Sequence, residues 1–184
     1  MMKVGIIVGS IRDGRIGAAA GDFVHRIAAA REGGAEYELI DLDAFDVPLL
    51  TSGTHPMMAN KQYDDAAVQA WSAAIDACDA YVFVTPEYNH SVPGAMKNAV
   101  DSLGGEWVGK PVAFVGYGSV GGVRAIEHWR QIISNFSMPN VRAEVNLSLF
   151  TDWTDGEFTP GERREAEVGA MLDALEQLAA TVRG

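Results

Sequence analysis

TPEYNHSVPGAMKNAVD, residues 85–101, follows the apolar run Tyr81–Val84, which has the length and the β-branched and aromatic composition of a buried strand. We expect Pro86 to end this strand, because proline has no amide hydrogen to donate within a central ladder. Ser91 is the expected N-cap of a following helix, with Pro93 near its first turn, where a missing N–H costs nothing. Apolar side chains then recur at helical spacing at Met96, Val100 and Leu103. The stretch therefore predicts a strand, a polar loop and a helix, and open parallel sheets bind ligands at such loops.

The same alternation of strand and helix runs along the rest of the chain. Apolar runs predict five strands, over residues 3–9, 37–42, 81–84, 111–115 and 141–149. Amphipathic patterns predict five helices, over residues 20–28, 67–75, 96–103, 125–136 and 168–182. Such alternation implies parallel strands joined by right-handed crossovers. We expect one three-layer α/β domain over residues 1–184, with a five-stranded parallel sheet in the order 2-1-3-4-5.

The composition is that of an acidic folded protein. Charged residues make up 21% of the chain, apolar residues 48%, and the net charge is −11. Such a surface repels phosphate backbones, so we expect neither nucleic acid nor an anionic membrane as partner. The single cysteine, Cys78, forbids an internal disulfide and is expected to be buried. The apolar run over residues 4–8 is too short for a signal sequence or a membrane span, and we expect a cytoplasmic protein.

The first predicted strand leads into a glycine-rich loop, GSIRDGRIG, at residues 9–17. Small residues, backbone amides at a helix N-terminus and two arginines make a receptor for a phosphate group. The loop has the glycine spacing of a Walker A motif, but Arg15 and Ile16 stand where that motif needs Lys and Ser/Thr, which disfavours triphosphate hydrolysis with Mg²⁺. The alternative is a tight turn with surface arginines.

A second glycine-rich loop, GYGSVG at residues 116–121, matches the dinucleotide fingerprint Gly-x-Gly-x-x-Gly. It follows the fourth predicted strand, whereas the fingerprint follows the first strand of a βαβ unit. The acidic residue required about 20 positions later is also poorly matched, since only Glu144 is near and it lies within the fifth predicted strand. We therefore reject a Rossmann site here.

Taken together, these stretches resemble the NAD(P)H-dependent FMN reductase family of flavodoxin-like proteins, which includes quinone, azo-dye and chromate reductases. The pattern Pro-Glu-Tyr-Asn-His-Ser-x-Pro-Gly-x-x-Lys-Asn-x-x-Asp in residues 86–101 is close to the family signature. Residues 9–17 resemble its phosphate loop, and residues 116–122 the glycine-rich loop beside the isoalloxazine ring. The resemblance implies a flavodoxin-like fold, FMN as cofactor and NADPH or NADH as electron donor.

The resemblance also implies the site residues. The FMN contacts would be Ser10, Arg12, Arg15, Ile16, Gly17, Pro86, Glu87, Tyr88, Asn89, Gly118, Ser119 and Gly121. Many relatives carry Ser and Asn in place of Arg15 and Gly17. Asn89 and Tyr88 are the catalytic candidates, with Asn89 or a neighbouring amide polarising the flavin near N5 and O4. His90 is not needed as a base, because the two cofactors carry the hydride chemistry themselves.

Several other residues remain open to two interpretations. Tyr117 either contacts the flavin or only packs. The remaining histidines, His25, His55 and His128, do not pair with a cysteine or carboxylate at ligand spacing, so we predict no metal site. The connection over residues 45–60 is long for an α/β protein. By the family resemblance, this stretch covers the flavin of a second chain in a homodimer or homotetramer, with Trp153 and Phe158 as further candidates; a self-packed surface loop is the alternative.

The predicted function is FMN-dependent oxidation of NADPH or NADH, with two electrons passed by a ping-pong mechanism to a quinone, azo compound, metal oxyanion or free flavin. One alternative is a one-electron carrier, whose phosphate loop is usually richer in Ser and Thr. Another is a non-catalytic flavin-binding interaction module. Arg12, Arg15 and Arg124 are all candidates to bind the 2′-phosphate of NADPH, so the sequence does not decide between NADPH and NADH.

Overall fold

The computed structural model describes all 184 residues and contains one five-stranded parallel sheet. Its strands are β1 (Met2–Val8), β2 (Ala35–Asp41), β3 (Ala80–Pro86), β4 (Val112–Gly118) and β5 (Asn140–Ser148). The helices are α1 (Gly17–Ala29), α2 (Ala66–Asp76), α3 (Gly94–Asp101), α4 (Val123–Ser134) and α5 (Arg163–Arg183). The strand order β2-β1-β3-β4-β5 confirms the predicted topology and the flavodoxin-like α/β fold.

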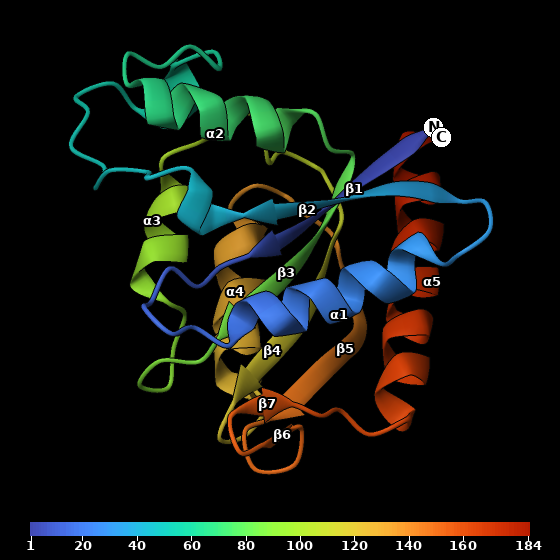
Figure 1. Ribbon diagram of the computed structural model, residues 1–184. Coiled ribbons are helices and arrows are strands. Elements are labelled where there is room, and N and C mark those ends of the chain that lie inside the picture. Colours follow the sequence, from blue (N-terminus) through green and yellow to red (C-terminus); the bar gives the residue numbers. More distant parts are fainter.

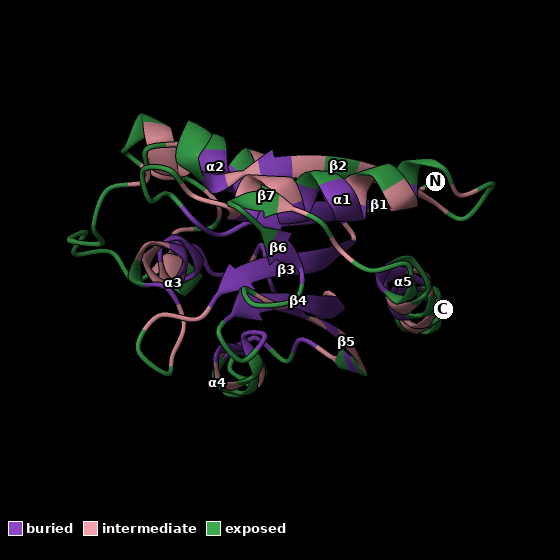
Figure 2. Cartoon of the chain, turned by 60° about the horizontal axis from the view of Figure 1, so that its bottom comes forward, coloured by how far each residue is buried: buried purple, intermediate pink, exposed green.

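The sheet is the middle of three layers (Figure 1). Side chains alternate across it, so that Val82 and Val84 pack with α1 and α5, while Tyr81 and Phe83 pack with α2, α3 and α4. β3, the central strand, is buried along its whole length, and Figure 2 shows the strands enclosed by helices with exposed outer faces. A strand covered on both faces must be apolar throughout, which is why this stretch of sequence is a continuous apolar run.

Aromatic side chains fill the core on the α2, α3 and α4 side. The Phe83 ring lies 5.4 Å from Trp129 and 5.9 Å from Phe114, centroid to centroid, in edge-on arrangements. Such pairs add about 0.5–1.5 kcal/mol each beyond the burial of their surface. This packing fixes β3 and β4 against α4, and the loops at the ends of both strands form part of the site described below.

The end of β3 agrees with the sequence expectation at Pro86 and differs from it at Ser91. Pro86 ends the strand as its last residue, paired with Tyr117 of β4, and the next amide, that of Glu87, donates to the Tyr117 carbonyl. Ser91 is not the helix N-cap, because α3 begins only after Pro93. Ser91 instead closes a tight turn with Tyr88, in which each residue's amide donates to the other's carbonyl, and its hydroxyl lies 2.8 Å from His128 Nδ1.

The polar segment between β5 and α5 contains a small hairpin. β6 (Trp153–Thr154) pairs with β7 (Glu157–Phe158) around Asp155 and Gly156, both of which have positive φ. An Asp-Gly pair is the usual sequence of such a turn. The hairpin folds Trp153 back into the core of its own chain, where its ring lies 6.1 Å from Tyr117, so Trp153 is not free to cover a neighbouring chain.

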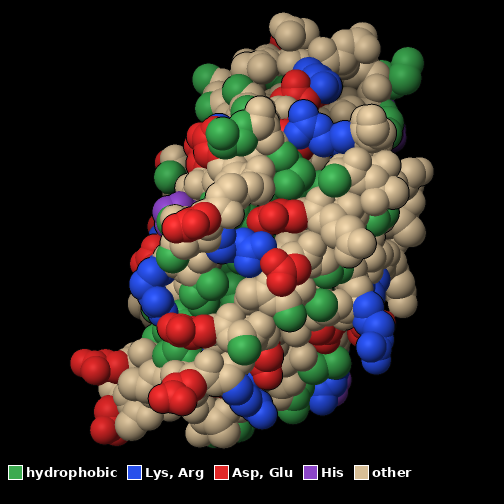
Figure 3. Space-filling model, turned by 90° about the vertical axis from the view of Figure 1, so that its right-hand side faces the viewer, with side chains coloured by type: hydrophobic (Ala, Val, Ile, Leu, Met, Phe, Trp, Pro, Cys, Tyr) green, Lys and Arg blue, Asp and Glu red, His purple; other side chains and the backbone are tan.

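The remaining surface carries interspersed charges. On the side where α5 lies, acidic and basic side chains are mixed over most of the face, and several acidic side chains gather at the lower left of the view (Figure 3). Arg31, for example, binds both Asp173 and Glu176 of α5. Cys78 is buried, as expected, and none of the helices combines the length and the apolar character needed to cross a membrane.

Candidate functional site

A cavity of about 270 Å³ opens at the carboxyl edge of the sheet. Its lining residues come from the loop after β1, the end of β3, the end of β4 and the turn after β5: Ser10, Arg12, Gly14, Arg15, Ile16, Pro86, Glu87, Tyr88, Tyr117, Gly118 and Leu149. β1 and β3 are neighbours in the sheet although β2 lies between them in sequence. The cavity therefore lies at the topological switch point, where doubly wound sheets bind ligands.

The loop after β1 presents an open helix N-terminus to this cavity. No side chain caps α1, and its first turn carries no acidic residue. The loop is closed by the Arg15 amide, which donates to the Arg12 carbonyl at 2.9 Å. The first amides of α1 have no partners within the helix, and the helix dipole adds positive potential there. This end of the cavity is suited to an anion such as a phosphate.

The two arginines of the loop differ in their bonding. Arg12 is exposed and makes no side-chain hydrogen bond or ion pair. Arg15 donates from Nη1 to Asp41 Oδ1 at 2.5 Å and from Nη2 to Asp41 Oδ2 at 2.6 Å. The same Nη1 donates to the Ser10 carbonyl at 2.7 Å. These hydrogen bonds hold the pKa of the Asp41 carboxyl below its usual range and raise that of Arg15.

The end of β3 contributes a wall whose polar groups are mostly paired. The Glu87 carboxylate accepts from Arg124 Nη1 at 2.5 Å and from the Arg124 amide at 3.0 Å, and its side chain is 6% exposed. Glu87 therefore ties β3 to the start of α4. Tyr88 reaches across the cavity, with its hydroxyl 3.1 Å from Ser10 Oγ. The only carboxylate lining the cavity is thus neutralised by an arginine, which suits an anionic ligand.

The end of β4 lies close to the loop that follows it. Gly121 and Gly122 have positive φ, and a side chain at Gly116 would collide with the Gly121 carbonyl. Gly118 lines the cavity. The Tyr117 hydroxyl, also at the cavity, is buried without a hydrogen-bond partner, and a Cβ at Gly17 would overlap it. Burial raises the pKa of Tyr117, so that its hydroxyl is a protonated donor at neutral pH.

These features fit FMN. The open N-terminus of α1 and the unpaired Arg12 offer a phosphate site, and the Ser10 and Tyr88 hydroxyls offer hydrogen bonds beside it. Pro86 and Leu149 supply apolar surface for a flat ring. Apart from Glu87, whose carboxylate is paired with Arg124, the lining side chains are donors, hydroxyls and apolar groups, which is the composition expected of a site for an aromatic phosphate ester.

Comparison with known proteins decides the family. The profile of the NADPH-dependent FMN reductases matches residues 2–152. The chain belongs to this family. An NAD(P)H-dependent FMN reductase of Nectria is 40% identical to this reductase, over 97% of the chain and 94% of the relative. An NAD(P)H-dependent FMN reductase from Saccharomyces cerevisiae is 34% identical, over 80% of the chain and 81% of the relative. The reductase is therefore an FMN-dependent oxidoreductase that uses NAD(P)H.

A solved structure supports the same assignment. The flavoenzyme NAD(P)H:(acceptor) oxidoreductase FerB from Paracoccus denitrificans superposes with a TM-score of 0.71 at 25% sequence identity, over 96% of the reductase and 98% of FerB. A quinone reductase of Escherichia coli is 33% identical, over 72% of the reductase and 69% of the relative.

The structure gathers most of the predicted FMN contacts around the cavity of the reductase: Ser10, Arg12, Arg15, Ile16, Pro86, Glu87, Tyr88 and Gly118. It leaves the others outside the lining. Asn89 lies exposed at the tip of the tight turn, with φ of 49°, Ser119 is exposed, and Gly17 and Gly121 are buried behind neighbouring residues. The twelve predicted contacts omit Gly14, Tyr117 and Leu149. Tyr117 had been left open, and Leu149 carries no sequence signal, because only the fold brings the turn after β5 to the cavity.

Proposed function

We propose that the reductase takes hydride from NADPH or NADH and passes two electrons to a quinone, an azo compound, a metal oxyanion or free flavin, in a ping-pong cycle. FMN, when bound, supplies the chemistry that accepts and donates hydride. The observation that carries the proposal is the cavity at the switch point, with the uncapped N-terminus of α1 at one end and apolar surface from Pro86 and Leu149. At its mouth, Leu149 is partly exposed and Phe150 is 78% exposed, so substrates can approach in turn.

The residues of the chain have separate roles in this proposal. Arg12 and the N-terminal amides of α1, from Gly17 onward, bind the phosphate, and the Ser10 hydroxyl, held by Tyr88, adds a hydrogen bond. Pro86, Ile16 and Gly118, which line the cavity, would orient the ring. Ser119 and Gly121, in the loop after β4, would add contacts to it. Asn89, at the tip of its turn, is proposed to polarise the ring near N5 and O4, together with Tyr88.

An anaerobic titration of the FMN-loaded protein with NADPH, and then with NADH, tests the two-electron step. We expect complete loss of the oxidised-flavin absorbance without the bands of a one-electron-reduced flavin. Stable one-electron bands with slow direct reduction would favour an electron carrier instead. Flavin that remains oxidised under excess of both nucleotides would favour a non-catalytic module.

Steady-state kinetics test the ping-pong order. With NADPH and a quinone varied together, double-reciprocal plots should be parallel, because the first product leaves before the acceptor binds at the same face. Intersecting lines would show that both substrates are bound at once and would exclude the shared face.

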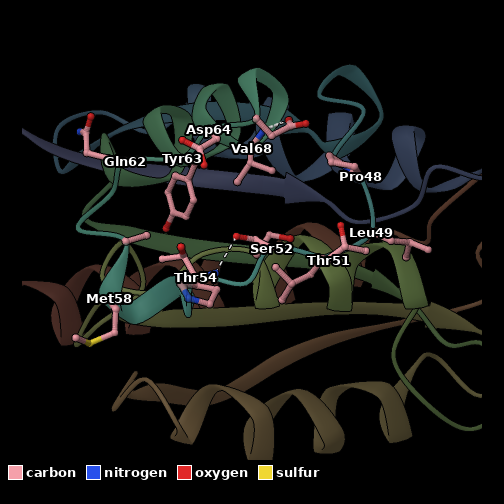
Figure 4. Close-up of a pocket in the computed structure, with 15 residues that line it drawn as sticks. Pro48, Leu49, Thr51, Ser52, Thr54, Met58, Gln62, Tyr63, Asp64 and Val68 are labelled. Atoms are coloured by element: carbon pink, nitrogen blue, oxygen red, sulfur yellow. Dashed lines mark hydrogen bonds between the residues drawn. The ribbon is translucent and has the colours of Figure 1, made fainter.

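We also propose that the reductase is a homodimer or homotetramer in which residues 45–60 contact a neighbouring chain. This segment exposes Leu49 and Met58 and borders a second cavity, of about 510 Å³ (Figure 4). Asn98 of α3 fixes the segment, since its side chain donates to the Pro48 carbonyl and accepts from the Leu50 amide. The segment is thus held in place while the Leu49 and Met58 side chains remain exposed, which favours an intermolecular contact.

A further inference from the structure

Both terminal nitrogens of the Arg15 guanidinium group are bonded within the protein. It meets both oxygens of Asp41 in a two-point contact, donates to the Ser10 carbonyl, and lies 3.3 Å from Asp43 Oδ2. Its side chain is only 17% exposed. Such a two-point contact attracts the guanidinium by its charge and also fixes the orientation of its plane. Arg15 lines the cavity, but its Nη donors point to groups of its own chain.

Arg12 is therefore the one free cation at this edge of the sheet. Among the fourteen Lys and Arg side chains, only Arg12 and Arg142 lack an acidic partner within 4.0 Å. Arg142 lies near the start of β5, at the end of the strand opposite to the cavity. A ligand phosphate at the loop after β1 would thus meet one unpaired guanidinium, not two.

Asp41 is placed to act on the loop through Arg15. It is the last residue of β2, directly paired with Val8, the last residue of β1. Ser10 follows two residues later, and its carbonyl is the third group that Arg15 holds. The Asp41–Arg15–Ser10 contacts therefore join the ends of two adjacent strands to the loop that carries Arg12.

We propose that Asp41 is a positioning residue of the flavin site, which orients the phosphate loop by holding Arg15 against the Ser10 carbonyl. The inference rests on the flavin site proposed above. Arg15 then acts as a brace and Arg12 as the phosphate-binding cation. The opposite arrangement is that Arg15 is a second phosphate ligand, which Asp41 merely competes for. The two arrangements predict opposite changes in FMN affinity when the Asp41 charge is removed. Binding weakens if Arg15 is a brace and tightens if Arg15 is a phosphate ligand.

The test compares the affinities of the apoprotein for FMN and for riboflavin, which lacks the phosphate, by titration calorimetry. In Asp41→Asn, a brace predicts about tenfold weaker FMN binding, equivalent to one charge-assisted hydrogen bond, with riboflavin binding unchanged. Arg15→Lys keeps the charge but loses the two-point contact, so it should show the same selective loss. The double variant Asp41→Asn/Arg15→Lys should bind FMN no more weakly than either single variant. Arg12→Ala should abolish most of the preference for FMN.

The matched control is Asp43→Asn, which removes a half-exposed carboxylate from the same arginine and should leave both affinities as in the wild type. Tighter FMN binding by Asp41→Asn would overturn the proposal, as would an equal loss of FMN and riboflavin affinity in Arg15→Lys. The binding readout needs no turnover. A wild-type protein that binds FMN but is not reduced by NAD(P)H would therefore disprove the proposed function without affecting this test.

Discussion

The Tyr117 hydroxyl is the one buried side-chain polar atom without a hydrogen-bond partner in this structure. A donor in that position has lost its hydration and gained nothing in exchange. We therefore expect Tyr117→Phe to stabilise the apoprotein, by about 1 kcal/mol, because removal of an unsatisfied buried hydroxyl relieves its desolvation penalty. Urea unfolding of the apoprotein, followed by circular dichroism, measures the change.

Tyr81 provides the control for this prediction. It is also buried, but its hydroxyl donates to the Ile75 carbonyl at 2.8 Å and accepts from Lys110 Nζ at 3.1 Å. Tyr81→Phe should therefore destabilise the protein by about 1 kcal/mol, the net value of a typical hydrogen bond. If both variants lose stability to the same degree, the hydroxyl of Tyr117 is bonded in solution and our interpretation of it is wrong.

At the scale of elements, one buried ion pair joins the turn after β5 to the start of α5. Arg164 donates from Nε and Nη2 to the two oxygens of Asp152, at 2.8 and 2.9 Å, and both side chains are less than a tenth exposed. Asp152 also accepts from the Ser148 amide. We expect Arg164→Met to cost about 3–5 kcal/mol, because it leaves the carboxylate buried and unpaired.

The neighbouring residue of α5 tests whether this cost comes from burial. Arg163 is exposed, and its ion pair with Glu167 is loose at 3.6 Å, so Arg163→Met should change the unfolding free energy by less than about 0.5 kcal/mol. In the double variant Asp152→Asn/Arg164→Met, part of the stability should return. A loss at Arg163 that equals the loss at Arg164 would contradict this account.

The Asp152–Arg164 ion pair makes the unfolding free energy depend on pH, so that it decreases toward acidic pH. Burial alone would raise the pKa of Asp152, but the hydrogen bonds from Arg164 and from the Ser148 amide outweigh it, and the pKa lies below its usual value. The stability that the pair contributes is therefore complete above about pH 4, the pKa of an unfolded aspartate, and is lost as the pH falls through the lower pKa of the folded state. The unfolding free energies of the wild type and Asp152→Asn should thus converge below about pH 4. A difference between them that stays constant from pH 7 to pH 3 would show that protonation of Asp152 is not coupled to unfolding.

The strands, and the contacts between elements, were predictable from the sequence to different degrees. Continuous apolar runs such as residues 81–84 identify buried strands, because a strand covered on both faces has no polar positions. The hairpin around Asp155 and Gly156 was missed, since two-residue strands have no periodicity. The pairing of Arg15 with Asp41 was also missed. It joins residues 26 positions apart on two elements, so only the register of β1 against β2 brings them together.

At the scale of the whole molecule, we propose that the segment over residues 45–60 determines whether the chains associate. Leu49 and Met58 are 78% and 73% exposed, on a segment whose backbone is fixed by Asn98. We expect light scattering after size-exclusion chromatography to show a dimer or tetramer in the wild type. Replacing both side chains, as Leu49→Ser and Met58→Ser, should shift the protein toward the monomer at micromolar concentration, because it removes the apolar area that drives association.

Phe150 is the control for this prediction. Its replacement shows whether association depends on residues 45–60 or on any exposed apolar side chain. Phe150 is as exposed as Leu49 but lies in the turn after β5, next in sequence to Leu149 of the cavity lining and outside residues 45–60. Phe150→Ser should leave the assembly state unchanged. If it dissociates the protein while Leu49→Ser/Met58→Ser does not, the contact between chains lies at the mouth of the cavity, and the neighbouring chain then restricts which electron acceptors can reach the flavin. A wild type that is monomeric at all concentrations would leave the cavity open on this side, and the choice of acceptor would depend on this chain alone.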